Sequence, residues 1–107
     1  ISLTFREKEG GKRVPAGTIT YVEVCVHDLL FHTGDGVIKQ WGTLSKYEAL
    51  LKSAHFARCH TSYLVNLKFV RSIKKDAVDV AGVLLPISRP RRKEFLAAFA
   101  QYKGGAV

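Results

Sequence analysis

The longest strand-like run, residues 18–27, constrains the fold more than any other stretch. Ile19, Tyr21, Glu23, Cys25 and His27 alternate with Thr20, Val22, Val24 and Val26, which is the two-residue period of a β-strand. Both sets contain apolar residues, so both faces should be partly covered by other parts of the chain. The run is therefore predicted to be the central strand of a sheet, ending where His27 and Asp28 interrupt it.

Short strand-like runs between turn signals fill most of the remaining sequence. Gly34-Asp35-Gly36 separates two such runs and predicts a hairpin, and Ala81-Gly82 predicts a second one. Gly10-Gly11 predicts a turn over residues 8–13, and residues 74–76 predict another. The further strands are expected at residues 1–5, 14–15, 29–33, 37–41, 56–59, 63–65, 67–73, 78–80 and 83–87.

Two segments have helical patterns. Ser45 and Glu48 form the Ser-x-x-Glu pattern of a capping box, which predicts a helix that ends near Ser53. A second helix is predicted over residues 90–102, with Gly104-Gly105 ending it. The expected apolar faces are Tyr47, Leu50 and Leu51 in the first helix and Phe95, Leu96, Phe99 and Tyr102 in the second. The chain is thus mainly β, and periodicity does not choose among barrel, sandwich and other arrangements.

Composition is typical of one globular domain, residues 1–107, with one core. Hydrophobic residues make up 47% and charged residues 24%, which argues against a disordered tail. No apolar run approaches the ~20 residues of a membrane helix, and the N-terminus has no signal-peptide pattern. Because the chain begins at Ile1 and has no Met, we expect it to be part of a longer protein.

The chain carries 17 basic and 9 acidic residues, a net charge of +8. An excess of this size indicates an anionic partner, most commonly nucleic acid. Cys25 and Cys59 form neither a metal-binding pattern nor a disulfide framework, so we expect no metal and no cofactor. Two free thiols fit a reducing cytosol and predict a cytoplasmic protein.

Two stretches could bind an anion. In residues 56–66, FARCHTSYLVN, the donors Arg58, His60, Thr61 and Ser62 stand together with no acid among them. In residues 89–93, RPRRK, four cations gather where a helix begins, although cations there cost about 0.3–1 kcal/mol each. Phosphate at the helix start would explain the second cluster. The alternatives are a polar bend between two strands and a solvated basic surface.

Other functions have less support. No phosphate-binding Gly-rich loop, GxSxG or HExxH pattern is present, and Cys59 and His60, as strand neighbours, would point to opposite faces, so we expect no enzyme. A basic β-rich module that binds an acidic protein or a membrane surface is supported by charge alone. RNA binding would need an aromatic strand, for which Tyr63 and Phe69 are the candidates.

The stretch 56–66 resembles the core signature F-x-R-x-H-x-S-Y-x-V-N of the LytTR family, the DNA-binding output domain of bacterial response regulators. Four further segments resemble the family in the same order. They are the Ile-x-Tyr-x-Glu strand at 19–23, the hairpin at 32–36, the helix at 44–51 and, with Ile87 in place of valine, the Pro-Val-Ser-Arg element at 85–89.

The resemblance implies an elongated fold of three small antiparallel sheets, with nine or ten short strands and two short helices. It also implies sequence-specific binding of double-stranded DNA by loops in the major groove, as the output domain of a transcription regulator. The expected partners are two repeated DNA half-sites and a receiver or other regulatory domain that precedes this one. Without coiled-coil patterns, the isolated domain is expected to be a monomer.

The resemblance further implies base-reading positions, which are His27, Thr61 and Arg89 here. Thr61 departs from the family's Arg or Asn and cannot make a bidentate contact. Pro90 disfavours the helical conformation at Arg89, so Arg89 is expected to be extended, outside the helix. The expected phosphate contacts are Arg58, His60, Ser62, Ser88, Arg91, Arg92 and Lys93.

Overall fold

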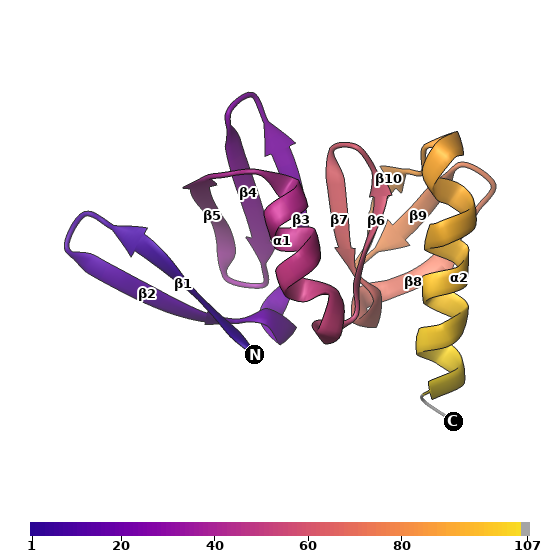
Figure 1. The fold of residues 1–107 in the computed structure, drawn as a ribbon, viewed down its shortest axis with the longest axis horizontal. Coiled ribbons are helices and arrows are strands. Elements are labelled where there is room, and N and C mark those ends of the chain that lie inside the picture. The colour runs from indigo at the N-terminus through magenta and orange to yellow at the C-terminus, as the bar shows by residue number, and fades with distance from the viewer. Residues whose placement is uncertain (106–107) are drawn as a thin grey trace.

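The computed structural model describes residues 1–105, which form an elongated body of 43 × 32 × 24 Å (Figure 1). The strands are β1 (Ser2–Glu7), β2 (Gly10–Pro15), β3 (Ile19–Cys25), β4 (Asp28–Thr33), β5 (Gly36–Trp41), β6 (Phe56–His60), β7 (Tyr63–Asn66), β8 (Val70–Ile73), β9 (Ala77–Val80) and β10 (Val83–Pro86). The helices are α1 (Leu44–Leu51) and α2 (Arg89–Gly105), with 3₁₀ turns η1 (Ala16–Thr18), η2 (Lys52–Ala54) and η3 (Leu67–Phe69).

The strands form three antiparallel sheets, as expected (Figure 1). The largest has the order β5-β4-β3-β7-β6, so the predicted central strand is confirmed. The others are the β1-β2 hairpin and a sheet of order β10-β9-β8. Both predicted hairpin turns are present, and Ala81 and Gly82 have φ values of 52° and 95°, which suit a two-residue turn between twisted strands.

The simple alternation predicted along β3 is wrong at its start. The pairing of β3 with β4 shifts register between Ile19 and Tyr21, so the side chains do not alternate there. Ile19 and Val22 consequently join one buried cluster, whereas Tyr21 joins another.

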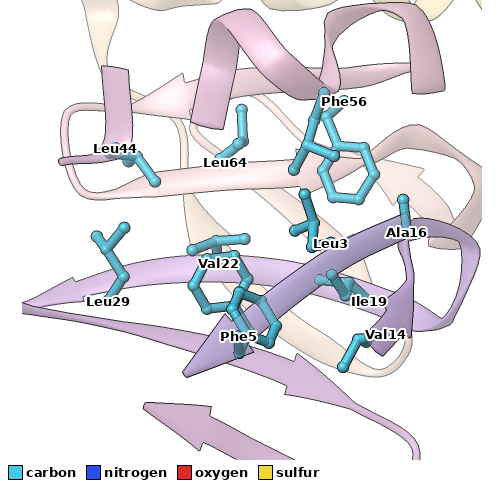
Figure 2. Packing of buried hydrophobic residues seen from close by; sticks show 12 residues of the cluster. Leu3, Phe5, Val14, Ala16, Ile19, Val22, Leu29, Leu44, Phe56 and Leu64 are labelled. Atoms are coloured by element: carbon cyan, nitrogen blue, oxygen red, sulfur yellow. The ribbon is translucent and has the colours of Figure 1, made fainter. Parts of the chain in front are cut away.

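Buried residues form two clusters, one on each face of the central sheet, where one core was expected. Figure 2 shows the first, which gathers Phe5 of β1, Val22 of β3, Leu64 of β7 and Phe56 of β6. The ring centroids of Phe5 and Phe31 lie 4.6 Å apart in it. In the second, the third sheet and α2 cover the opposite face. Tyr21, Cys59 and Val65 of the central sheet form this cluster together with Leu67, Val78, Val80, Leu85, Ile87 and Phe95. The elongated shape follows, because the central sheet has covering layers on both sides.

The N-terminal hairpin is longer than predicted. Gly10 and Gly11 lie in β2 and pair with β1, so the turn is limited to Lys8-Glu9. The strand at 67–73 is also shorter than predicted. It begins with η3, because the Asn66 side chain accepts a hydrogen bond from the Lys68 N–H and bends the chain there.

Both helices differ from prediction at their starts. α1 begins at Leu44, its N-cap Thr43 makes no side-chain cap bond, and Ser45 and Glu48 instead contact Arg58. Leu50, assigned to the apolar face, is 46% exposed. α2 begins at Arg89, one residue earlier than predicted, and extends through Gly105 rather than ending before the glycines.

Candidate nucleic-acid interface

Three connections meet along one edge of the molecule (Figure 1). They are the β3–β4 turn, the β6–β7 turn and the start of α2. The Val24 N–H donates to Ser62 O at 3.0 Å, and the Ser88 N–H donates to Cys59 O at 2.9 Å. These backbone bonds hold the three connections side by side, and each connection carries one of the predicted base-reading residues.

His27 lies in the two-residue turn between β3 and β4 and is exposed, rather than buried at a strand end. Its neighbour Val26 has φ 59°, a conformation that strains a β-branched residue. Val26 is 83% exposed, and Trp41, which pairs with Asp28 just beyond the turn, is 82% exposed. Sequence patterns gave no sign of these two exposed apolar side chains.

Arg58 is largely buried beneath the candidate interface, with a side chain that is 10% exposed. It donates from Nη2 to Thr61 O at 2.6 Å and from Nε to His60 O at 3.4 Å. Its Nη1 donates to Ser45 Oγ at 3.2 Å and to Glu48 Oε1 at 3.0 Å. These bonds hold the β6–β7 turn closed and leave Arg58 little surface for a phosphate.

The β6–β7 turn presents Thr61 to solvent, while His60 and Ser62 are half-buried. The Ser62 N–H donates to His60 Nδ1 at 3.1 Å. Because Nδ1 accepts, the proton of the neutral ring resides on Nε2, which has no partner within residues 1–105. His60 can therefore act both as a turn cap and as a donor to an anion.

The cationic residues at the start of α2 differ in whether their side chains are bonded within the protein. Arg91 donates to Glu48 Oε2 at 3.4 Å, and Arg92 donates to the carbonyls of Lys74 and Lys75. Arg89 and Lys93 are exposed and make no side-chain hydrogen bond or ion pair in the described part of the chain.

Arg89 is the first residue of α2, so the expected extended conformation outside the helix is wrong. Pro90 is tolerated in the first turn because its missing N–H would have no helical acceptor there. Ser88 O accepts from the Arg91 N–H at 3.1 Å, while Ser88 Oγ is buried without a partner among residues 1–105. The hydroxyl of Ser88 is therefore not presented to an anion in this conformation.

Glu48 is the residue at this interface that sequence reasoning assigned to another role. Its carboxylate contacts arginines from two different elements, although the Ser-x-x-Glu spacing indicated a local cap. The only available signal was that an acid stands in a strongly basic chain, three residues after a serine.

The two cysteines differ sharply in environment. Cys25 is exposed, and Cys59 is fully buried. Burial raises the pKa of the Cys59 thiol to about 12, so it stays protonated at neutral pH. Among residues 1–105 no group of three or more His, Cys, Asp or Glu side chains could hold a metal ion. Neither helix in this range is both long enough and apolar enough to cross a membrane.

Comparisons with known proteins point to one family. The family model of the LytTr DNA-binding domain matches residues 10–100. Among solved structures, the LytTr DNA-binding domain of a response regulator from Bacillus cereus is similar, with a TM-score of 0.79 and 22% identity. The match covers 91% of this chain and 94% of that one, and at this identity it establishes the fold. A comparison with curated proteins finds no match.

Proposed function

This chain belongs to the LytTR family of DNA-binding domains, and from that membership we propose that it binds double-stranded DNA sequence-specifically as the output domain of a bacterial transcription regulator. The observation that carries the proposal is the single edge on which the β3–β4 turn, the β6–β7 turn and the start of α2 meet. A chain with a net charge of +8 presents there three exposed side chains that can donate to bases.

Loops, rather than a helix, would enter the major groove. His27, Thr61 and Arg89 come from three different connections, and each is exposed. After Pro90, α2 exposes Lys93 and Glu94 near its start and Gln101 and Lys103 near its end. Between them it exposes only Ala97 and Ala100, which offer no donor to a base edge, so it has no continuous polar face. We assign base reading to His27, Thr61 and Arg89, of which Arg89 is the best suited to guanine.

Phosphate binding would fall mainly to residues around these readers. Within the described residues 1–105, neither the Lys93 ammonium group nor the His60 Nε2–H has a hydrogen-bond partner. Arg91 and Arg92 keep donors beyond those they use within the protein. Ser62 borders them, whereas Arg58 and Ser88 fit a supporting role better than the direct contact expected from sequence.

The proposed mode of binding is one monomer per half-site. Two similar half-sites about one helical turn apart, ~10–10.5 base pairs, would place two domains on the same side of the duplex. A receiver or other regulatory domain in the full-length cytoplasmic protein would then bring the two domains together. Sedimentation of the isolated domain, and footprinting on a selected duplex, would test these two points.

Selection of random duplexes, followed by titration of the selected site at several salt concentrations, tests the proposed function. If about five phosphates are neutralised, log K falls against log salt with a slope of about −4 to −5. A scrambled duplex of equal length is the control for sequence preference. A flat titration, or no binding at low salt, would instead favour a basic protein-interaction module.

A further inference from the structure

Glu48 lies between the two connections that carry Thr61 and Arg89. One carboxylate oxygen accepts from Arg58 Nη1 at 3.0 Å, and the other accepts from Arg91 Nη1 at 3.4 Å. We propose that Glu48 is a positioning residue that fixes the spacing of the β6–β7 turn and the start of α2, and so sets DNA sequence preference. This inference rests on the proposed DNA binding.

The first half of the link runs from Glu48 through Arg58 to the β6–β7 turn. Arg58 engages four of its five N–H donors inside the protein, and two of these close the turn at His60 O and Thr61 O. The side chain is nearly enclosed, so its position depends on these acceptors. Glu48 is the only charged group among them, and its loss would release the guanidinium and loosen Thr61.

The second half runs from Glu48 to Arg91, two residues after Arg89 in the first turn of α2. The backbone bond from Ser88 N–H to Cys59 O attaches the start of α2 to β6 at one point. Arg92 also bonds the carbonyls of Lys74 and Lys75, and Phe95 is buried, so α2 is anchored to the third sheet as well. The contact between Glu48 and Arg91 adds a side-chain link from the start of α2 to Arg58, and through Arg58 to the β6–β7 turn. This link would fix the separation of Arg89 and Thr61, as two readers of one groove require.

Charge shows why this role differs from simple attraction to DNA. A carboxylate beside the interface repels phosphate, so on electrostatics alone its removal would strengthen binding to every sequence. Glu48 also holds two arginines away from phosphates, which lowers non-specific affinity. A positioning role therefore predicts opposite effects on specific and non-specific binding when Glu48 is neutralised.

The test compares Glu48→Gln with Glu94→Gln. Glu94 lies in α2, is exposed and makes no ion pair among residues 1–105, so its neutralisation changes the net charge equally without breaking the link. Affinities are measured for a selected duplex and a scrambled duplex over a salt series. In Glu48→Gln we expect the ratio of specific to non-specific affinity to fall about 5- to 10-fold. For the scrambled duplex, the slope of log K against log salt should become steeper by up to about 2, because Arg58 and Arg91 are released to contact phosphates. Glu94→Gln should leave the ratio unchanged.

A second variant covers loss of stability. A thermal melt shows whether Glu48→Gln is folded at the assay temperature. If it is not, Arg58→Lys keeps the charge but cannot hold Glu48 and both turn carbonyls at once, and it should lower the ratio similarly. Equal ratios in the wild type and the folded variant would overturn the positioning role while DNA binding stands. A wild type that binds no duplex would overturn the proposed function itself, and the positioning role with it.

Discussion

Replacing Arg89 should separate DNA recognition from stability, because its side chain is exposed and makes no hydrogen bond or ion pair among residues 1–105. We expect Arg89→Ala to weaken the best site by about 1–3 kcal/mol, which is roughly 5- to 150-fold, and to relax preference at one base position. The unfolding free energy should stay unchanged or rise by up to about 1 kcal/mol, because a cation is removed from the N-terminus of a helix. A loss of binding with no loss of stability is the expected signature.

Arg89→Lys and Lys93→Ala serve as matched comparisons in the same assay. Arg89→Lys keeps the charge but loses the two-pronged contact, so it should bind scrambled duplex normally and still lose the base preference. Lys93→Ala, in the same helical turn, should weaken all sequences about equally and reduce the salt slope by about 1.

Fluorescence anisotropy with selected and scrambled duplexes measures the affinities, and repeated selection measures the preference at each base. Two results would refute base reading by Arg89. One is full recovery of site binding in Arg89→Lys. The other is unchanged preference at every base position in Arg89→Ala, which would make Arg89 another phosphate contact.

Two stability predictions follow from buried polar groups. Asn66 is 2% exposed, and its side chain donates to Ile19 O and accepts from the Lys68 N–H. Asn66→Ala should therefore lower the unfolding free energy, measured by urea titration, by about 2–3 kcal/mol. A change of less than about 0.5 kcal/mol would contradict the role given to these bonds. The pKa of Cys59 is raised to about 12, so the folded state keeps a proton that the unfolded state loses above about pH 9. This contribution is complete below about pH 9 and is lost as the pH rises toward 12. The unfolding free energy should therefore fall more steeply from pH 9 to 11 in the wild type than in Cys59→Ala, and parallel curves would count against it.

The parts of the fold that sequence reasoning placed correctly depend on local patterns. Alternation with apolar residues on both faces identified β3 as a central strand, and Gly34–Gly36 and Ala81-Gly82 marked real hairpin turns. The bulge at Ile19 and Tyr21 was not predictable, because register depends on the partner strand. Gly10 and Gly11 were assigned to a turn for a related reason: glycine permits a strand when a paired neighbour supplies the hydrogen bonds.

The candidate site divides in the same way. The family resemblance named His27, Thr61 and Arg89, and the fold brings their connections to one edge. The resemblance could not show which cationic side chains are bonded within the protein, because those bonds depend on acceptors from other elements. Arg92 meets the carbonyls of the β8–β9 turn, a contact across 17 to 18 residues of sequence. A cluster of cations in sequence therefore overstates the number free to bind phosphate.

Ser45 and Glu48 show why a correct local pattern can have a different role in the fold. A spacing of three suits a capping box, but it also places two side chains on the same side of a helix. A local cap contributes about 1 kcal/mol, and solvent can satisfy the exposed donors at the start of α1 equally well. An arginine that is 10% exposed has no such substitute, because its N–H groups must find acceptors within the protein. The requirement of Arg58 for hydrogen-bond acceptors therefore determines the orientation of Ser45 Oγ and the Glu48 carboxylate. This requirement arises only when β6 packs beside α1.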